Sequence, residues 1–386
     1  MKQKLVSIVA SVLSALTVTT MPFAASAAEN PADYTIKDYT TAEGFYNRVT
    51  LSKTWQQSED RVERGEMLQL PQYMLDRMTT DALVEAVLDY PFFYDVYAFD
   101  DVQIGFDLMM DTFNGVQELA DRDDVASVLL DKYCDEDVMM EADSADADSE
   151  IFRLTNMEIL MSQDFVTTKF NKKEKNKFVK NVASKMEDKL ASEVCGEFTN
   201  NLLFDLAEKN FNDGGLLKNM QDVKDGAYTV GYVTTPKGSK VTVAVYDSEP
   251  LTFTQRAVLD ARYQRDYPNA TMLSGASGKY NCHSYAWYSQ STSNNKWMNN
   301  PLKYVNDGSY SLVKTTPSAN QKALYVSYKN PKPEDYPDGL PIHSAILNSH
   351  SGNSYNMTSK WGKCGLFKHE YNDCPYAYYL IYFFKR

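Results

Sequence analysis

The chain is poor in positive charge, and after its first 27 residues it has no apolar run long enough to cross a bilayer. It carries 39 Lys and Arg against 52 Asp and Glu, for a net charge of -13 at pH 7. Nucleic-acid binding depends on neutralising phosphates, so this balance disfavours nucleic acid as a partner and also tight adsorption to an anionic surface. The apolar segment 378–384 is only strand-sized. The sequence also lacks internal repeats and a glycine-rich phosphate loop.

The first 27 residues have the pattern of a secretory signal. Lys2 and Lys4 precede a mostly apolar stretch over 5–18, and Ala25-Ser26-Ala27 fits a small-residue cleavage site. The apolar stretch is short for a membrane span, and no cysteine lies near the cleavage point. We therefore expect a signal peptide over 1–27 that is removed. The mature protein is expected to be soluble, without a transmembrane segment, and secreted or associated with the cell wall.

Residues 28–217 are predicted to form a helical domain. Prolines are nearly absent from its main part, and runs of β-branched residues are scarce. Thr80 and Asp81 are expected to cap a helix over 82–88. The acidic stretch 131–150 lacks the central glycine and closing glutamate of an EF-hand loop, so a solvated acidic loop is favoured over a calcium site. No residue of this domain gives a functional signal.

Residues 218–269 are predicted to form a β-hairpin and a connecting helix, because apolar and polar residues alternate on both sides of Pro236-Lys237-Gly238-Ser239. Residues 270–386 have short segments rich in Gly, Asn, Ser and Tyr, and they are predicted to form a third unit built on a sheet. The fold class is therefore predicted to be α+β. Strands are expected at 309–314, 323–328, 342–347, 354–361 and 378–385.

The five cysteines are an odd number for an exported chain. Cys364 and Cys374 flank a short stretch that suits a hairpin, so a disulfide between them is predicted. Cys134 and Cys195 form a second possible pair, although sequence alone cannot place them close together. The alternative is that no cysteine is bridged. With both pairs formed, Cys282 remains as a free thiol.

Cys282 lies in the run Tyr280-Asn281-Cys282-His283-Ser284-Tyr285-Ala286-Trp287, which has the character of a loop entering a short helix. A thiol at a helix N-terminus is expected to be acidified by the helix dipole. His343 follows in Pro341-Ile342-His343-Ser344-Ala345-Ile346-Leu347, which is predicted to be a strand with its histidine on the face of Ala345 and Leu347. An imidazole near a thiol can take its proton and later protonate a leaving group. The pair predicts a cysteine hydrolase that works by acyl transfer.

These two motifs resemble the compact papain-like hydrolases of bacterial cell walls, namely the NlpC-type endopeptidases and the CHAP amidases. The resemblance covers about residues 270–386. When segments 307–310, 359–362 and 374–376 are added to the two motifs, the chain resembles most closely a group of uncharacterised exported proteins of Gram-positive bacteria, which implies no established substrate. The resemblance implies a papain-like domain with a nucleophile helix packed on an antiparallel sheet. It also implies cleavage of an amide bond in peptidoglycan stem peptides, or of their link to the glycan.

The resemblance also assigns roles to residues. Cys282 is expected to be the nucleophile and His343 the base, while the backbone N–H groups of Cys282 and His283 face the oxyanion. In the family a polar residue on the following strand orients the imidazole. That strand lacks an obvious match here. Asn356 is the best candidate for this third residue, Ser359 the next, and His369 a more distant one.

The remaining aromatic and metal-binding residues give weaker signals. Trp297 is the best candidate for contact with a substrate in a groove. A zinc site built from His283, His343, His369 and a cysteine is disfavoured, because the spacings are not those of a structural zinc site. His283, which follows Cys282 directly in the sequence, is expected either to lie on the surface or to support the site without contacting the substrate. The predicted mechanism needs no metal or cofactor.

Two other functions remain open. The first is a non-catalytic surface or adhesion protein that uses a papain-like scaffold for binding, which the lack of an obvious third residue supports. The second is a protease or transamidase that uses the same Cys-His chemistry on proteins. Reactivity of Cys282 toward a thiol-directed electrophile separates the scaffold from the enzymes, and substrate profiling separates the two kinds of enzyme.

Overall fold

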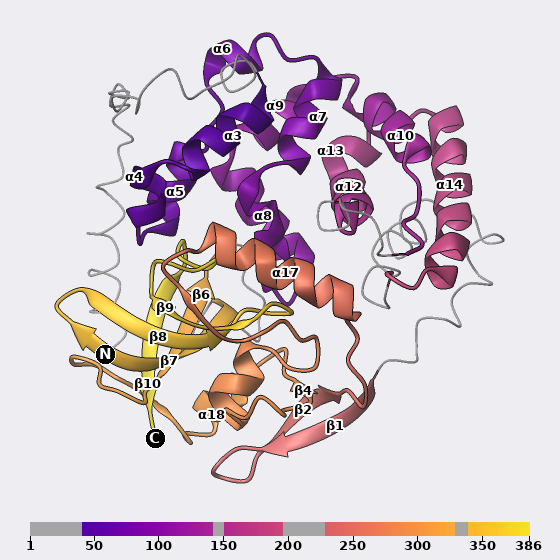
Figure 1. Ribbon diagram of the computed structural model, residues 1–386. Coiled ribbons are helices and arrows are strands. Elements are labelled where there is room, and N and C mark those ends of the chain that lie inside the picture. Colours follow the sequence, from indigo (N-terminus) through magenta and orange to yellow (C-terminus); the bar gives the residue numbers. More distant parts are fainter. Residues whose placement is uncertain (1–40, 142–149, 196–227, 329–338) are drawn as a thin grey trace, which may run out of the picture. The chain divides into compact units, whose positions relative to one another are not determined.

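The computed structural model describes residues 41–141, 150–195, 228–328 and 339–386 (Figure 1). The predicted signal peptide over 1–27 lies outside these residues. So do residues 142–149 of the acidic stretch 131–150. The described chain has helices in its N-terminal part and antiparallel sheets in its C-terminal part, so the predicted α+β class is confirmed. Among the described helices, none combines the length and the apolar character that a membrane crossing requires.

The described part of the N-terminal region is built mainly from short helices, several of which start at a polar capping side chain. Thr79 caps α7 by accepting a hydrogen bond from the N–H of Ala82, one residue earlier than expected. A capping box of Asn171 and Glu174 starts the longest of these helices, α14. The elements are α3 (Ala42–Thr50), α4 (Lys53–Gln57), α5 (Arg61–Met67), α6 (Gln72–Leu75), α7 (Thr80–Leu88), the 3-10 helix η2 (Pro91–Ala98), α8 (Val102–Thr112), α9 (Asn114–Asp121), α10 (Val125–Asp135), α12 (Arg153–Met161), α13 (Asp164–Thr167) and α14 (Lys172–Ala191).

The predicted hairpin is present. Strands β1 (Thr229–Thr234) and β2 (Lys240–Val245) pair antiparallel around a turn in which Gly238 has a φ of 88°, a conformation that favours glycine. The sequence did not predict the third strand of this sheet, β4 (Lys296–Trp297), which pairs with β2. Helix α17 (Phe253–Asp266) follows the hairpin, as expected, and starts with a capping box of Thr252 and Gln255.

The C-terminal region contains an antiparallel sheet of seven strands in the order β3-β9-β8-β7-β6-β10-β5. Four of the five predicted strands match full strands, and the fifth is reduced to two residues. The sequence missed β3 and β9. The bounds are β3 (Thr271–Ser274), β5 (Ser311–Leu312), β6 (Lys322–Ser327), β7 (Leu340–Ser351), β8 (Ser354–Lys360), β9 (Leu366–Glu370) and β10 (Leu380–Lys385).

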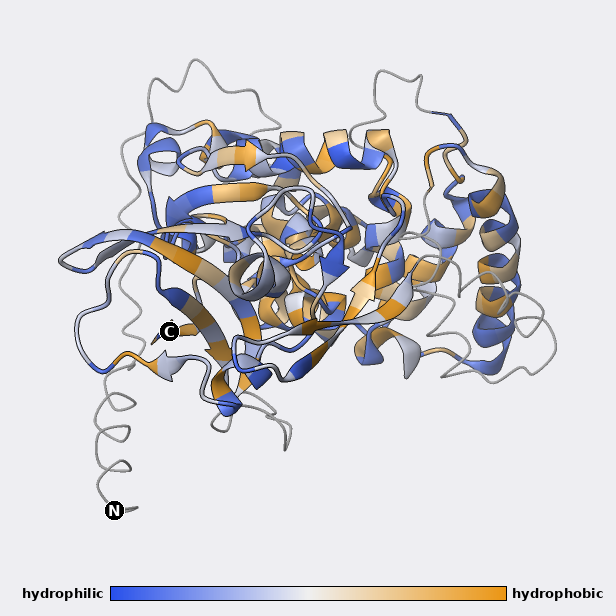
Figure 2. Ribbon diagram, turned by 90° about the horizontal axis from the view of Figure 1, so that it is seen from below, coloured by the Kyte–Doolittle hydropathy of each residue, from blue (hydrophilic) through white to orange (hydrophobic). Residues whose placement is uncertain are grey.

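The two faces of this sheet pack against different elements. Ala345 and Leu347 of β7 belong to the same hydrophobic core as the described helices of the N-terminal region. Ile346, which alternates with them, packs in a second core with Trp287 of the short helix η4 (Ser284–Tyr288) and Tyr304 of α18 (Lys303–Asn306). Figure 2 shows the corresponding alternation of polar and apolar bands along helices and strands. Residues at both faces of β7 are thus placed in buried surroundings.

Candidate active site around Cys282

Cys282 starts a short helical stretch that runs through His283 into η4, as the sequence predicted, and Asn281 fixes the turn that precedes it. The Asn281 side-chain oxygen accepts hydrogen bonds from the N–H groups of Ser284 and Met298, both at 3.1 Å. Its amide nitrogen donates to the carbonyl of Met298 at 2.8 Å and to Oδ2 of Asp100 at 2.7 Å. One buried amide therefore ties the cysteine loop to β4 and to the N-terminal region. Asn281 was not among the predicted site residues.

The Cys282 thiol is buried, with only 1% of its surface exposed. The backbone N–H groups of Ser344 and His283 lie close enough to the sulfur to lower the pKa of the thiol. Burial nevertheless raises the pKa of this thiol well above its usual value, and the nearby Asp100 carboxylate raises it further. The expected acidification by a helix N-terminus is therefore wrong for this structure. The helix that follows, η4, has only five residues of π-helix, so its dipole is small compared with the effect of burial.

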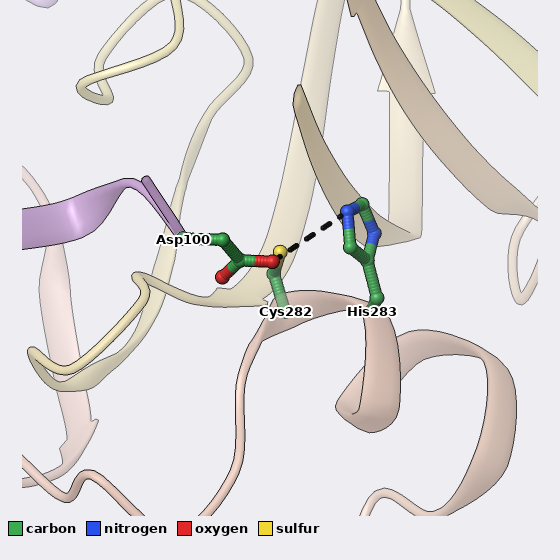
Figure 3. Close-up of side chains that lie close together, drawn as sticks. All are labelled: Asp100, Cys282 and His283. Carbon is green, nitrogen blue, oxygen red and sulfur yellow. Dashed lines mark ion pairs between the residues drawn. The ribbon is translucent and has the colours of Figure 1, made fainter. Parts of the chain in front are cut away.

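Asp100 and His283 lie beside the sulfur (Figure 3). The carboxylate, the imidazole and the sulfur each have a ligand atom within 4.8 Å of the other two. The His283 ring is 1% exposed, so the expectation of a surface position is wrong. Burial lowers the pKa of His283 to about 3. Its Nδ1 lies 2.7 Å from Oγ of Ser344, which also accepts a hydrogen bond from Nε1 of Trp287 at 2.8 Å.

Asp100 is the site residue that the sequence could not reveal. It lies between η2 and α8, far along the chain from Cys282, and only the tertiary fold brings the two together. Its Oδ2 accepts from Asn281 and lies 4.0 Å from Nε2 of His283, whereas its buried Oδ1 has no hydrogen-bond partner among the described residues. Burial raises the pKa of Asp100 to about 7.

His343 lies on β7 with its ring on the face of Ala345 and Leu347, as predicted. It stacks on Tyr376, with ring centroids 3.6 Å apart and planes 10° from parallel, and its side chain is fully buried. Burial lowers the pKa of His343 well below its usual value, so the ring is neutral at pH 7. Neither ring nitrogen has a hydrogen-bond partner among the described residues. The hydrogen bond of the predicted Cys282–His343 pair is therefore not formed in this structure.

None of the three candidates for the third residue, Asn356, Ser359 and His369, orients His343; the ring nitrogens of His369 contact Oγ of Ser359 and, at 2.7 Å, the carbonyl oxygen of Glu370. Asn356 accepts a hydrogen bond from Asn348 at 3.0 Å and donates to Glu370 at 3.2 Å. Ser359 lies 2.8 Å from Nε2 of His369 and accepts from Nε1 of Trp361. Each of these polar groups is already bound to another partner, whereas His343 stacks on Tyr376.

The predicted disulfide is also not formed, since all five cysteines are free. The Cys374 thiol donates to the carbonyl of Tyr371 at 3.3 Å, and the Cys364 thiol interacts with the hydroxyl of Tyr263. The two sulfurs therefore point to different neighbours. Trp297, the predicted substrate contact, is only 8% exposed and packs under the ammonium of Lys363, 5.4 Å from the ring centroid. It does not present a free ring to a groove.

A buried lysine beside the site was also missed. Lys360, at the end of β8, is fully buried and donates to the carbonyls of Ser277 at 2.9 Å, Gly362 at 2.7 Å and Cys364. Three acceptors match the three N–H donors of an ammonium group. Burial lowers its pKa to about 8, and its charge in turn favours the thiolate of Cys282. A lysine at the end of a predicted strand gives no sequence signal for such a position.

Comparison with protein-family profiles, with curated proteins and with solved structures finds no match to this chain.

Proposed function

We propose that the chain is an exported cysteine hydrolase that cleaves an amide bond by acyl transfer, with Cys282 as the nucleophile and His343 as the base. The C-terminal region, about residues 270–386, would be a papain-like domain. Its substrate class, taken from the resemblance of the two sequence motifs, is the stem peptides of peptidoglycan. No nucleic acid is part of the proposal.

The observation that carries this proposal is the unpartnered imidazole of His343. A buried polar group without a hydrogen bond is costly, so such groups point to a functional role. His343 is fully buried, and neither of its ring nitrogens has a hydrogen-bond partner among the described residues. The backbone N–H of the next residue, Ser344, lies close enough to the Cys282 sulfur to lower the pKa of the thiol. Tyr376, on which the ring stacks, also lies near Cys282. We propose that the imidazole, which has no hydrogen-bond partner among the described residues, accepts the proton of the Cys282 thiol.

The chemistry follows from these roles. His343 takes the proton of the Cys282 thiol as the sulfur attacks the amide carbonyl, and the backbone N–H of Cys282, with that of His283, faces the oxyanion. The intermediate collapses to a thioester as the C–N bond breaks and His343 gives its proton to the leaving amine. Water, deprotonated by His343, then attacks the thioester. This releases the acid and restores the thiol.

On this proposal, the described structure would correspond to a closed state of the site. Segment 97–100 of the N-terminal region lies over it: Tyr376 donates to the carbonyl of Ala98, Lys363 donates its N–H to the carbonyl of Tyr97, and Asn281 donates to Asp100. Burial raises the pKa of Cys282 and lowers that of His343, so proton transfer between them is unfavourable while both are covered. Displacing the segment brings the two pKa values together. We therefore propose that the hydrolase is latent and is activated by opening.

Replacing Asp100 by Ala is expected to raise the rate at which iodoacetamide alkylates Cys282 at pH 7 by at least about tenfold. The substitution removes a carboxylate that raises the thiol pKa and the hydrogen bond from Asn281 that holds the covering segment. Mass spectrometry of the Cys282 peptide over time measures the rate. The matched control is Asp107→Ala, which removes an exposed carboxylate on α8 and leaves the segment in place.

In the wild-type protein, the alkylation rate should still rise with pH above 9.0, the ordinary pKa of a thiol, because the pKa of Cys282 is raised. A wild-type rate that is already maximal at pH 8 would contradict the closed state. The burial of Cys282 and His343 also favours the second candidate, a non-catalytic surface protein on a papain-like scaffold. Equal alkylation rates in the wild type and Asp100→Ala would support that candidate.

A further inference from the structure

We propose that Asp100, Cys282 and His283 form a binding site for a divalent transition-metal ion of the zinc class. These residues differ from the zinc set that the sequence analysis considered and disfavoured, because Asp100 comes from the N-terminal region and His343 and His369 are not included. The site would hold the ion through one carboxylate oxygen, the sulfur and Nε2 of the imidazole. It does not depend on the proposed hydrolase activity, since binding needs only the three donors.

The spacing of the donors suits such an ion. One ligand atom from each residue lies within 4.8 Å of the other two. Zinc binds sulfur at about 2.3 Å and nitrogen or oxygen at about 2.0–2.2 Å, so tetrahedral ligands lie roughly 3.3–3.8 Å apart. The three side chains would therefore have to close by about 1 Å, which rotation of a carboxylate and a cysteine side chain can supply. Figure 3 shows the three groups pointing toward one another.

The chemistry of the donors selects the ion. Sulfur and imidazole are ligands of zinc and related transition metals, whereas calcium and magnesium prefer oxygen. Three protein ligands leave the fourth position of a tetrahedral ion for water. The Asp100 side chain is 20% exposed, while Cys282 and His283 are 1% exposed, so entry and the open position lie on the Asp100 side.

Groups behind the ligands already hold them in place. His283 Nδ1 contacts Oγ of Ser344 at 2.7 Å, which leaves Nε2 to face Asp100 and the sulfur. In metal sites, the ring nitrogen of a histidine that does not bind the metal usually has a hydrogen-bond partner, which orients the ring. Asn281 fixes Oδ2 of Asp100 at 2.7 Å, while Oδ1 is buried without a partner in the described chain. Oδ2, which lies 4.0 Å from Nε2 of His283, is the oxygen that would face the ion.

Binding here would place the metal on the proposed nucleophile. The Cys282 proton is released to solvent on coordination, and the thiolate is then held by the ion and cannot attack a carbonyl. The predicted consequence is a reversibly blocked thiol, in a site that already lies under segment 97–100.

Titration of the full-length, untagged and chelator-free protein with Co²⁺ tests the site. A thiolate bound to Co²⁺ gives an intense sulfur-to-metal absorption band in the near ultraviolet, which neither oxygen nor nitrogen ligands produce. Cys134→Ser/Cys195→Ser serves as the background, because these two half-buried thiols could bind the metal adventitiously. In that background we expect the band to appear and to saturate at one equivalent, and Zn²⁺ to displace it.

The variants Cys282→Ser, His283→Gln and Asp100→Asn separate this site from others, with circular dichroism to select folded proteins. We expect no sulfur band in Cys282→Ser and at least about tenfold weaker binding in the other two. Ser344→Ala, which removes only the support of His283, should weaken binding by about 10- to 100-fold. An unchanged band in Cys282→Ser, unchanged affinity in both His283→Gln and Asp100→Asn, or no band at all overturns the site. Peptidoglycan cleavage is not read out, so the hydrolase proposal stands or falls separately.

Discussion

Replacing Cys282 by Ala is expected to lower the rate of peptidoglycan cleavage by at least about a thousandfold. The rate that remains would come only from substrate binding and stabilisation of the oxyanion. Alanine removes the sulfur and leaves His343 with no thiol to deprotonate. The loss should not come from unfolding, because the side chain is small and apolar in a buried position, and circular dichroism should be unchanged. The measurement is the release of new amino groups from purified peptidoglycan by opened protein, such as Asp100→Ala.

The matched controls separate this thiol and this imidazole from others in the chain. Cys134→Ala removes a half-buried thiol of α10 and should leave cleavage unchanged. His343→Ala should lower the rate by about 10²- to 10⁴-fold, as expected for loss of a general base. His350→Ala, on the same strand, should have no such effect. Equal cleavage by Cys282→Ala and its parent protein excludes the sulfur as nucleophile.

Replacing Arg64 by Met is expected to lower the free energy of unfolding by about 3–5 kcal/mol. Arg64 of α5 forms an ion pair with Asp373, with side-chain exposures of 0% and 1%, and it donates to the carbonyl of Asp266. Methionine keeps most of the volume but leaves the Asp373 carboxylate buried without its cation. Burial already raises the pKa of Asp373 to about 6 despite Arg64, so the uncompensated charge is costly.

Urea unfolding at pH 7 measures this effect. The control is Lys177→Met, which breaks an ion pair with Asp131 whose side chains are 43% and 70% exposed. That change should cost about 0–1 kcal/mol, because solvent screens an exposed pair. The double variant Arg64→Met/Asp373→Leu should recover much of the loss, since no charge is then left unpaired. A loss below about 1 kcal/mol in Arg64→Met would show that the pair is solvated.

The strands that alternate clearly were predictable from the sequence, and the rest of the sheet was not. His343 lies on the same face of β7 as Ala345 and Leu347 because successive side chains of a strand point to opposite faces. This placement follows from the spacing of the three residues in the sequence. The sequences of β3 and β9 do not show a clear alternation of apolar and polar residues bounded by turn residues. The two-residue β4 is a strand only because it pairs with β2. Pairing partners far apart in the chain leave no local pattern.

The site was predictable in part for the same reason. The position of Cys282 before a short helix follows from local sequence, whereas Asp100 reaches it only through packing of the N-terminal region. The state of the thiol could not be predicted either. A helix dipole favours a charge by about 0.3–1 kcal/mol, less than one pKa unit, whereas full burial shifts a pKa by up to about 3–5 units. The exposure that decides between them is a property of the whole fold.

The most direct test of acyl transfer is peptidoglycan cleavage by the opened protein with hydroxylamine present. A thioester on Cys282 can be attacked by hydroxylamine in place of water, which gives an acyl hydroxamate. We predict that hydroxamate appears in proportion to hydroxylamine concentration, and that it is absent with the Cys282→Ala form of the same protein. Cleavage that yields only the free acid at every hydroxylamine concentration would contradict the acyl-enzyme, and with it the role proposed for Cys282.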